Sequence, residues 1–481
     1  MNTAPGRPGL PVARQVRAQA RETARPLSAA SIVVGASLAA LTLVGLFVLL
    51  DYQFAQSTAR LVKLLLGLSG IGVLVILPQA GLLLIPIATP LLGLLPKLPV
   101  PGMNTVNVLF FTIFFSFAFT QVLQRRPMMR AGMLMAPLGI LLGLAGLSVI
   151  RGAAFPTGMK FDAGHSGLAL FRALMSVTPY VGVLAMSRGA PSRRRLLAAV
   201  LIGFAFETGF TFLYGRNLRG RAGGTIGQAN ELGTYLAMFT VMALAMGFGF
   251  RSWFGRFALW GLAIAGGLGV FMSVSRGALV AVAAGALLVA ARTSRTLLAF
   301  MLIVMATSPL WVPDYVKERV VNTITSSDDS DETQIEGGAE ERLNTWHSLL
   351  LIVQDHPLDG IGFAGLAEVL PSIGEELGIT VKDSAHNTFL RMLAEVGIGG
   401  LVAFLAVWWM CWRLAAKGVK TATTRFDRQM AVGLQGMIVA FALSCAFGDR
   451  FFEIMIAGNF WVVCALVEDA VRENRKPQVP A

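Results

Sequence analysis

Charged residues are scarce in this sequence. Only 14% of the 481 residues are Asp, Glu, Lys or Arg, whereas 55% are hydrophobic, and the mean hydropathy is +0.66. A soluble protein would have to hide more apolar surface than its interior can hold, so this composition excludes a soluble globular protein. Repeated apolar windows of about 17 to 25 residues are each long enough to cross a bilayer core of about 30 Å. They predict an all-α, polytopic membrane protein rather than a barrel of short alternating strands.

Cysteine and histidine are also rare, with three and four copies. None of them has neighbours at the spacings that metal sites require, so we predict no metal site and no cofactor. All three cysteines lie in apolar runs, where we expect packing residues rather than a disulfide framework. They are Cys411, Cys445 and Cys464.

The net charge of +13 has the sign that binds nucleic acid, but its distribution argues against that partner. When the N-terminus is placed inside the cell and the apolar segments alternate, 24 of the 40 basic residues fall in inner loops and tails. One large loop, Pro313 to Asp383, falls outside and carries 15 of the 27 acidic residues. This is the positive-inside pattern of a multi-pass membrane protein, and it predicts that both termini are cytoplasmic.

The apolar segments divide the chain into five parts. We expect a basic cytoplasmic tail (1–27), transmembrane helices (28–312), an outer loop domain with two or three short helices (313–386), further transmembrane helices (387–470) and a cytoplasmic tail (471–481). The total is about 12 to 14 spans. They are expected at 28–50, 61–78, 79–96, 105–123, 132–150, 166–186, 195–214, 231–250, 256–274, 277–292, 296–312, 388–412, 429–447 and 452–469.

Three arginines and five glycines lie in the sixteen outer residues from Gly215 to Asn230. Glycines let the backbone approach a bulky ligand, and Arg216, Arg219 and Arg221 each offer a planar fork for phosphate oxygens. The segment is therefore a candidate anion site, and Asn230 is a candidate cap of the next helix. The alternative is an ordinary basic loop that binds lipid headgroups.

The sequence Ser275-Arg276-Gly277 interrupts an apolar stretch that runs from Phe257 to Ala291. A charge inside such a stretch is costly unless it has a partner, so Arg276 is a candidate second cation for the same anionic ligand. Snorkelling to the outer interface is the alternative. Other charges near the membrane are expected to pair with one another: Arg172 with Glu207, and Arg391 with Glu395.

His386 and Asn387 lie where the outer loop meets the apolar run Thr388 to Trp412. A titratable imidazole at a membrane boundary can transfer protons, which the aliphatic side chains around it cannot. Alternatively, His386 is only an interfacial residue that caps the helix. Upstream in the loop, Arg342 and Trp346 lie on an expected short helix, and Trp346 either stacks on sugar rings or anchors the loop at the interface.

Four motifs, taken in order, resemble those of the O-antigen ligase and polymerase superfamily of bacterial surface-polysaccharide enzymes. The resemblance covers about residues 200 to 410. The first motif is similar to the family's Arg-Ala-x-Gly-Thr-x-Gly-x-x-Asn; it runs from Arg221 to Asn230 and has Ala229 where many members have proline. The remaining three are Ser275-Arg276-Gly277, His356-Pro357-x-x-Gly360-x-Gly362, and His386-Asn387 followed after nine residues by Gly397-Ile398-Gly399-Gly400.

This resemblance implies an inverting, metal-independent glycosyltransferase in the bacterial inner membrane, with a periplasmic active site. The implied donor is a glycan on undecaprenyl pyrophosphate, and the implied acceptor is a sugar hydroxyl on lipid A–core or on another glycan. Membrane lipids are further expected partners, and nucleic acid is not. The family's catalytic residues carry over to Arg221, Arg276 and His386, with Arg219 as an alternative to Arg221. The implied substrate-binding residues are Arg216, Arg219, Asn230, Arg342, Trp346 and Asn387.

The residue types agree with this chemistry, because arginines neutralise a departing pyrophosphate and an imidazole accepts the proton of a hydroxyl. We rank an O-antigen ligase first and an O-antigen or exopolysaccharide polymerase second. A protein O-oligosaccharyltransferase and a polysaccharide transporter follow in that ranking. A transporter predicts pseudo-symmetric halves and polar residues throughout the membrane depth, whereas the candidate residues here cluster at the outer face.

Overall fold

We analysed a computed structural model of the chain. It describes residues 78–95, 101–125, 127, 130–154, 161–214, 221–311, 333–379, 381 and 384–474. The chain divides into two compact units, which are described separately. One comprises residues 1–78 and 112–127, and the other comprises residues 79–111 and 128–481. In the first unit, the described residues form mainly the second half of helix α5 (Thr105–Leu123).

The described residues are almost entirely helical and contain no strand, which confirms the all-α prediction. Nine helices among them are long and apolar enough to cross a membrane, so the protein is a multi-pass membrane protein. Two expected spans, 28–50 and nearly all of 61–78, lie outside the described residues. The nine helices are α5, α6 (Met135–Ala154), α7 (Ala163–Met186), α8 (Gly189–Tyr214), α10 (Trp253–Ser273), α11 (Arg276–Thr293), α17 (Thr388–Thr421), α18 (Arg425–Ala446) and α19 (Ile454–Glu473).

Two expected spans are broken into pieces that are too short to cross. The segment 79–96 forms α4 (Pro78–Ala88) and the 3₁₀ helix η1 (Pro90–Leu94). Proline has no N–H to donate, so Pro86 and Pro90 remove bonds that a continuous helix needs. The segment 296–312 forms α12 (Arg295–Ala306), of only 12 residues, and α13 (Ser308–Trp311). The predictions of single spans in these two segments are therefore wrong.

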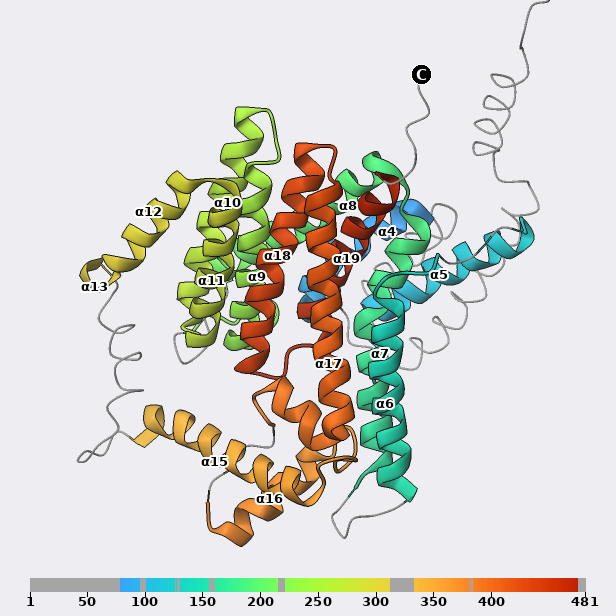
Figure 1. Ribbon diagram of the computed structural model, residues 1–481, viewed down its shortest axis with the longest axis vertical. Helices are drawn as coiled ribbons and strands as arrows, with labels where there is room; N and C mark the ends of the chain where they lie inside the picture. Colours follow the sequence, from blue (N-terminus) through green and yellow to red (C-terminus); the bar gives the residue numbers. More distant parts are fainter. Residues whose placement is uncertain are drawn as a thin grey trace, which may run out of the picture. The chain divides into compact units, whose positions relative to one another are not determined.

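Helix α9 (Ala229–Gly247) forms the centre of the second unit, against α10, α11 and α18 (Figure 1). Nearly all of its residues are buried, and it is not among the nine candidate spans. Glycines allow this close packing: a Cβ atom at Gly433 of α18 would lie 2.6 Å from Sδ of Met242 of α9. The predicted span at 231–250 is thus a helix, but one surrounded by other helices rather than by lipid.

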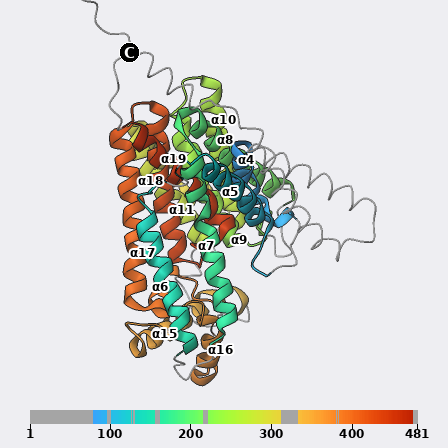
Figure 2. The ribbon, with the colours of Figure 1, turned by 90° about the vertical axis from the view of Figure 1, so that its right-hand side faces the viewer.

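The loop between α13 and α17 contributes two described helices, which agrees with the expected number, but the first of them is longer than the short helices predicted. Helices α15 (Thr333–Asp355) and α16 (Leu366–Leu377) lie together at one end of the second unit, next to the start of α17 (Figures 1 and 2). Leu349, Ile352 and Leu370 form an apolar cluster that also includes Ala394 of α17. This cluster fixes the loop helices to the membrane helices, and we call this end of the unit the loop end.

The opposite end is fastened by a buried ion network. Arg193 of α8 is only 1% exposed, and its guanidinium lies 3.0 Å from Asp469 and 3.3 Å from Asp427, with Glu473 also in contact. These carboxylates belong to α18 and α19. The network compensates the cost of burying each charge and ties three helices together.

Candidate functional site

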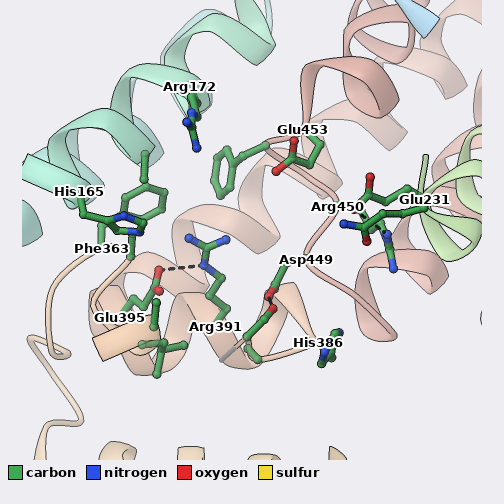
Figure 3. A pocket seen from close by; sticks show the side chains of 18 of the residues that line it. His165, Arg172, Glu231, Phe363, His386, Arg391, Glu395, Asp449, Arg450 and Glu453 are labelled. Carbon is green, nitrogen blue, oxygen red and sulfur yellow. Dashed lines mark hydrogen bonds and ion pairs between the residues drawn. The ribbon is translucent and has the colours of Figure 1, made fainter. Parts of the chain in front are cut away.

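A pocket of about 400 Å³ lies at the loop end of the second unit. Its walls come from the N-terminal parts of α7, α9 and α17, from the start of α16 and the loop before it, from the residues just before α17, and from the turn between α18 and α19. Three arginines, two histidines and four carboxylates line it (Figure 3). We call it the arginine pocket; its charged and imidazole side chains are Arg172, Arg391, Arg450, His165, His386, Glu231, Glu395, Asp449 and Glu453.

The three arginines of the pocket have different partners. Arg391 donates from Nε to Glu395 at 2.9 Å, which confirms the predicted pair on one turn of α17. Arg450 lies 3.6 Å from Glu231 of α9. Arg172 is exposed and makes no direct hydrogen bond or salt bridge with another described residue, although its charge acts on nearby Glu453. The pocket therefore holds two arginines fixed by carboxylates and a third that faces the open space (Figure 3).

His386 occupies a strained position in the pocket wall. Its φ is +46°, in the left-handed region that a histidine adopts only at a cost. The residues on either side hold it there: Trp346 of α15 donates from Nε1 to the Ala385 carbonyl at 3.0 Å, and the Asn387 side chain caps α17 by accepting from Phe389 N at 3.0 Å and Leu390 N at 3.2 Å. The cap of this helix is thus Asn387, which leaves the imidazole of His386 in the pocket.

Backbone strain gathers around this site. Four non-glycine residues in the described part of the chain have positive φ, and two of them, Ala364 and His386, line the pocket. A third, Val274, directly precedes Ser275-Arg276. Such conformations cost roughly 1–3 kcal/mol each and occur preferentially where a side chain is aimed for binding or chemistry.

A kink in α17 explains the glycine motif that follows His386. Gly397 has φ +77° and ψ −172°, so the helix is interrupted there. The loop His356–Gly362 fills the interruption with backbone hydrogen bonds. Ile361 N donates to Ala394 O at 3.0 Å, Gly362 N to Glu395 O at 2.9 Å, and Ile398 N to Pro357 O at 3.0 Å. The His356–Gly362 motif and the glycine motif at Gly397 therefore form one structural unit, joined by backbone hydrogen bonds next to Glu395.

The predicted catalytic arginines lie at the loop end but outside the lining of the pocket. Arg221 donates to Asn230 Oδ1 at 2.8 Å and to Ser273 O at 3.1 Å, and Asn230 does line the pocket. Arg276 begins α11, where Gly233 of α9 allows a close approach of Ser273 and Ser275. The structure thus brings Arg221 to the edge of the pocket and Arg276 to the neighbouring helix end.

Two predictions about this region are wrong. Asn230 does not cap α9, because the N-cap position is Gln228 and the Asn230 side chain accepts from Arg221. Glu207 does not pair with Arg172. Its carboxylate accepts from the backbone N–H of Thr225 at 2.9 Å and also contacts the Thr225 hydroxyl. Glu207 therefore holds the glycine-rich loop against α8, and a Cβ atom at Gly224 would overlap its carboxylate.

The remaining predicted residues are placed as follows. Arg216 and Arg219 lie outside the described residues. Arg342 and Trp346 lie on α15 and do not line the pocket, and the Trp346 ring packs against the apolar cluster of α15 and α16. Within the described residues, no three His, Cys, Asp or Glu side chains are grouped so that they could hold a metal ion.

Sequence reasoning missed several residues of the pocket. Asp449, Arg450 and Glu453 lie in the short turn between α18 and α19, and His165 lies in the first turn of α7. The signal was present, because charges between two long apolar runs are the same kind of exception that singled out Arg276. Arg450 is buried, and burial lowers its pKa while Glu231 and Asp449 oppose that change; the guanidinium stays protonated.

The helices and the charged pocket at their end define a multi-pass membrane protein with a polar internal site. A family model described as O-Antigen ligase matches residues 261–405, a segment that contains Arg276, His386 and the kink at Gly397. This segment of the chain is therefore similar to the O-antigen ligase family, and the similarity supports a glycan-transferring enzyme of the ligase and polymerase type. No curated protein matches the chain.

Proposed function

We propose that the protein is an O-antigen ligase-like glycosyltransferase, which moves a glycan from undecaprenyl pyrophosphate to a sugar hydroxyl on lipid A–core. The observation that carries the proposal is the position of His386. It lines the arginine pocket and lies inside the segment matched by the O-antigen ligase family. The proposal places the pocket on the periplasmic side of the bacterial inner membrane and both termini in the cytoplasm.

In this proposal His386 is the general base. Its imidazole takes the proton from the acceptor hydroxyl while that oxygen attacks the anomeric carbon of the donor sugar. The bond between the anomeric carbon and the phosphate oxygen breaks, its electron pair leaves with the pyrophosphate, and the configuration inverts. The left-handed backbone of His386 supports this role, because a strained conformation is retained where it aims a reactive side chain.

Arg221 and Arg276 would stabilise the departing pyrophosphate. Fixed positive charges act most strongly where negative charge develops in the transition state. Arg221 is held by Asn230 and by the carbonyl of Ser273, so it is pre-organised for that task. The carboxylates of the pocket have a separate role in the proposal, since Glu395 and Glu231 hold Arg391 and Arg450 in place.

Deletion of the gene in its host, followed by gel analysis of surface glycans, tests the proposal. A ligase leaves lipid-linked polymer in the membrane and bare lipid A–core. Core that is capped with a single repeat unit indicates a polymerase instead. Unchanged surface and lipid-linked glycans would contradict both. The proposed reaction needs no metal ion, so activity that EDTA abolishes and magnesium restores would contradict that part of the mechanism.

A further inference from the structure

One wall of the arginine pocket is not used by the proposed reaction. It is formed by Arg172 of α7, by Arg391 of α17 and by the ring of Phe363, which lies under the Arg391 guanidinium at 5.3 Å. In Figure 3 the guanidinium groups of Arg172 and Arg391 approach the same open space, and His386 lies away from them near Arg450. The pocket thus has a second cationic region, apart from His386, and the carboxylates of Glu395 and Glu453 lie beside its two arginines.

Arg172 is the more informative of the two arginines. It lies on a membrane-spanning helix, roughly 14 Å from the start of α7 at 1.5 Å per residue. Its side chain is exposed, and no described residue bonds to it. A guanidinium at this position is costly unless an anion compensates it. The nearby charge of Glu453 supplies part of that compensation without bonding to Arg172, so the exposed guanidinium keeps donors that a ligand anion can use.

Arg391 is the second arginine that can bind an anion in this region, together with Arg172. Its Nε is bonded to Glu395, which is 1% exposed and cannot easily move. That bond leaves the two terminal nitrogens directed toward the pocket, as Figure 3 shows. Two guanidinium groups from different helices offer a phosphate or carboxylate several charge-assisted hydrogen bonds. Phe363 and Phe452, in edge contact at 5.6 Å, add apolar rings on which a sugar can pack.

We propose that Arg172 and Arg391 form an acceptor subsite for a saccharide that carries a phosphate or carboxylate, with Glu395 as the positioning residue for Arg391. The inference rests on the proposed function, in which the donor diphosphate faces Arg221 and Arg276. Donor and acceptor must meet at His386. Because the donor diphosphate occupies the side of Arg221 and Arg276, the region around Arg172 and Arg391 remains for the acceptor. A pocket of about 400 Å³ has room for one or two sugar units.

The test compares two acceptors in vesicles that contain the full-length protein and a lipid-linked donor. One acceptor is a core oligosaccharide with one phosphomonoester, and the other is the same oligosaccharide after phosphatase treatment. Wild-type enzyme should prefer the phosphorylated acceptor by about tenfold or more in kcat/KM, the value of one to two charge-assisted hydrogen bonds. Arg172→Gln and Arg391→Gln should lose this preference, mainly through KM. Glu395→Gln should reduce it, and Arg172→Lys should restore part of it.

A binding measurement separates this inference from the proposed function. Calorimetry of purified protein with the phosphorylated oligosaccharide, without donor, should show binding that Arg172→Gln weakens and that the remote control Arg256→Gln does not. Equal kcat/KM for the two acceptors, or a preference that survives in Arg172→Gln, overturns the inference while the proposed function stands. Wild-type protein that transfers glycan to neither acceptor overturns the proposed function instead.

A lipid headgroup is the other source of a phosphate. The same assays are therefore run in phosphatidylcholine vesicles with and without phosphatidylglycerol. An acceptor preference that is the same in both vesicles supports the subsite. If instead Arg172→Gln changes only the response to phosphatidylglycerol, the arginine binds lipid and the acceptor subsite is contradicted.

Discussion

Gly397 of α17 is in direct backbone contact with Leu358, in the loop between α15 and α16. A Cβ atom at Gly397 would overlap the Leu358 carbonyl oxygen and would lie 2.8 Å from Asp359 N. The φ of Gly397 is +77°, a conformation that L side chains rarely adopt. The kink and the loop are therefore interdependent, and the position of Glu395 and Arg391 in the pocket depends on both.

Gly397→Ala should destabilise the protein and reduce transfer. The strained backbone costs about 1–3 kcal/mol, and the displaced loop adds to it. The matched control is Gly399→Ala, because Gly399 is two residues away in the same helix and has nothing within 4 Å of a Cβ atom. Thermal unfolding in detergent measures both variants. Equal unfolding midpoints would show that the loop does not depend on the kink.

Arg193→Met should lower the unfolding midpoint strongly. The substitution leaves Asp427 and Asp469 buried without their cation, and breaking such a pair from one side costs about 3–5 kcal/mol. Arg195→Met removes an exposed arginine from the same helix and should have little effect. Similar losses from the two substitutions would contradict the buried network.

Thr225→Val should destabilise the loop between α8 and α9. It removes the hydroxyl that donates to the Pro90 carbonyl at 2.7 Å and contacts Glu207, and the loss of such a bond costs about 1–3 kcal/mol when its partner stays buried.

Arg172→Gln should leave the unfolding midpoint unchanged, because Glu207 is bonded to Thr225 and not to Arg172. A large destabilisation by Arg172→Gln would instead support a pair between Arg172 and Glu207.

The first turn of α7 should respond to acid through Asp162. Its carboxylate accepts from His165 N at 3.0 Å and Gly164 N at 2.8 Å, and these bonds lower its pKa. When folding lowers the pKa of an acid, that acid stabilises the folded state at any pH above its unfolded-state pKa, which is about 3.9 for Asp. The stabilisation is lost as the pH falls through the lower pKa of the folded state. Hydrogen exchange at His165 should therefore differ between wild type and Asp162→Asn at neutral pH and converge in strong acid. A difference that persists there would contradict the assignment.

Much of the membrane architecture could be predicted from the sequence, because bilayer thickness sets the length of each apolar run. The predictions failed where local chemistry overrides hydropathy. Pro86 and Pro90 break a run that is apolar enough to span. Hydropathy also carries no information about which helix faces lipid, so it did not reveal that α9 is enclosed by other helices.

The site was predictable only in part. His386 was found because one imidazole stands at the boundary between the polar loop and an apolar helix. Arg172 was paired with the wrong carboxylate, because depth along two helices does not fix the direction in which each side chain points. Asp449 and Arg450 were missed because they form a turn of a few residues between two long apolar runs. The pocket is assembled from five segments, and only the three-dimensional fold brings them together.

The role of His386 as the general base is tested by glycan transfer from an undecaprenyl-pyrophosphate donor in vesicles, with His386→Asn compared with wild type. Asparagine tolerates the left-handed backbone at this position, so the substitution removes the base while preserving the fold, which an unchanged unfolding midpoint would verify. The account predicts a loss of about 10²- to 10⁴-fold in transfer rate, the usual contribution of a general base. Transfer at the wild-type rate by a correctly folded His386→Asn protein would contradict it.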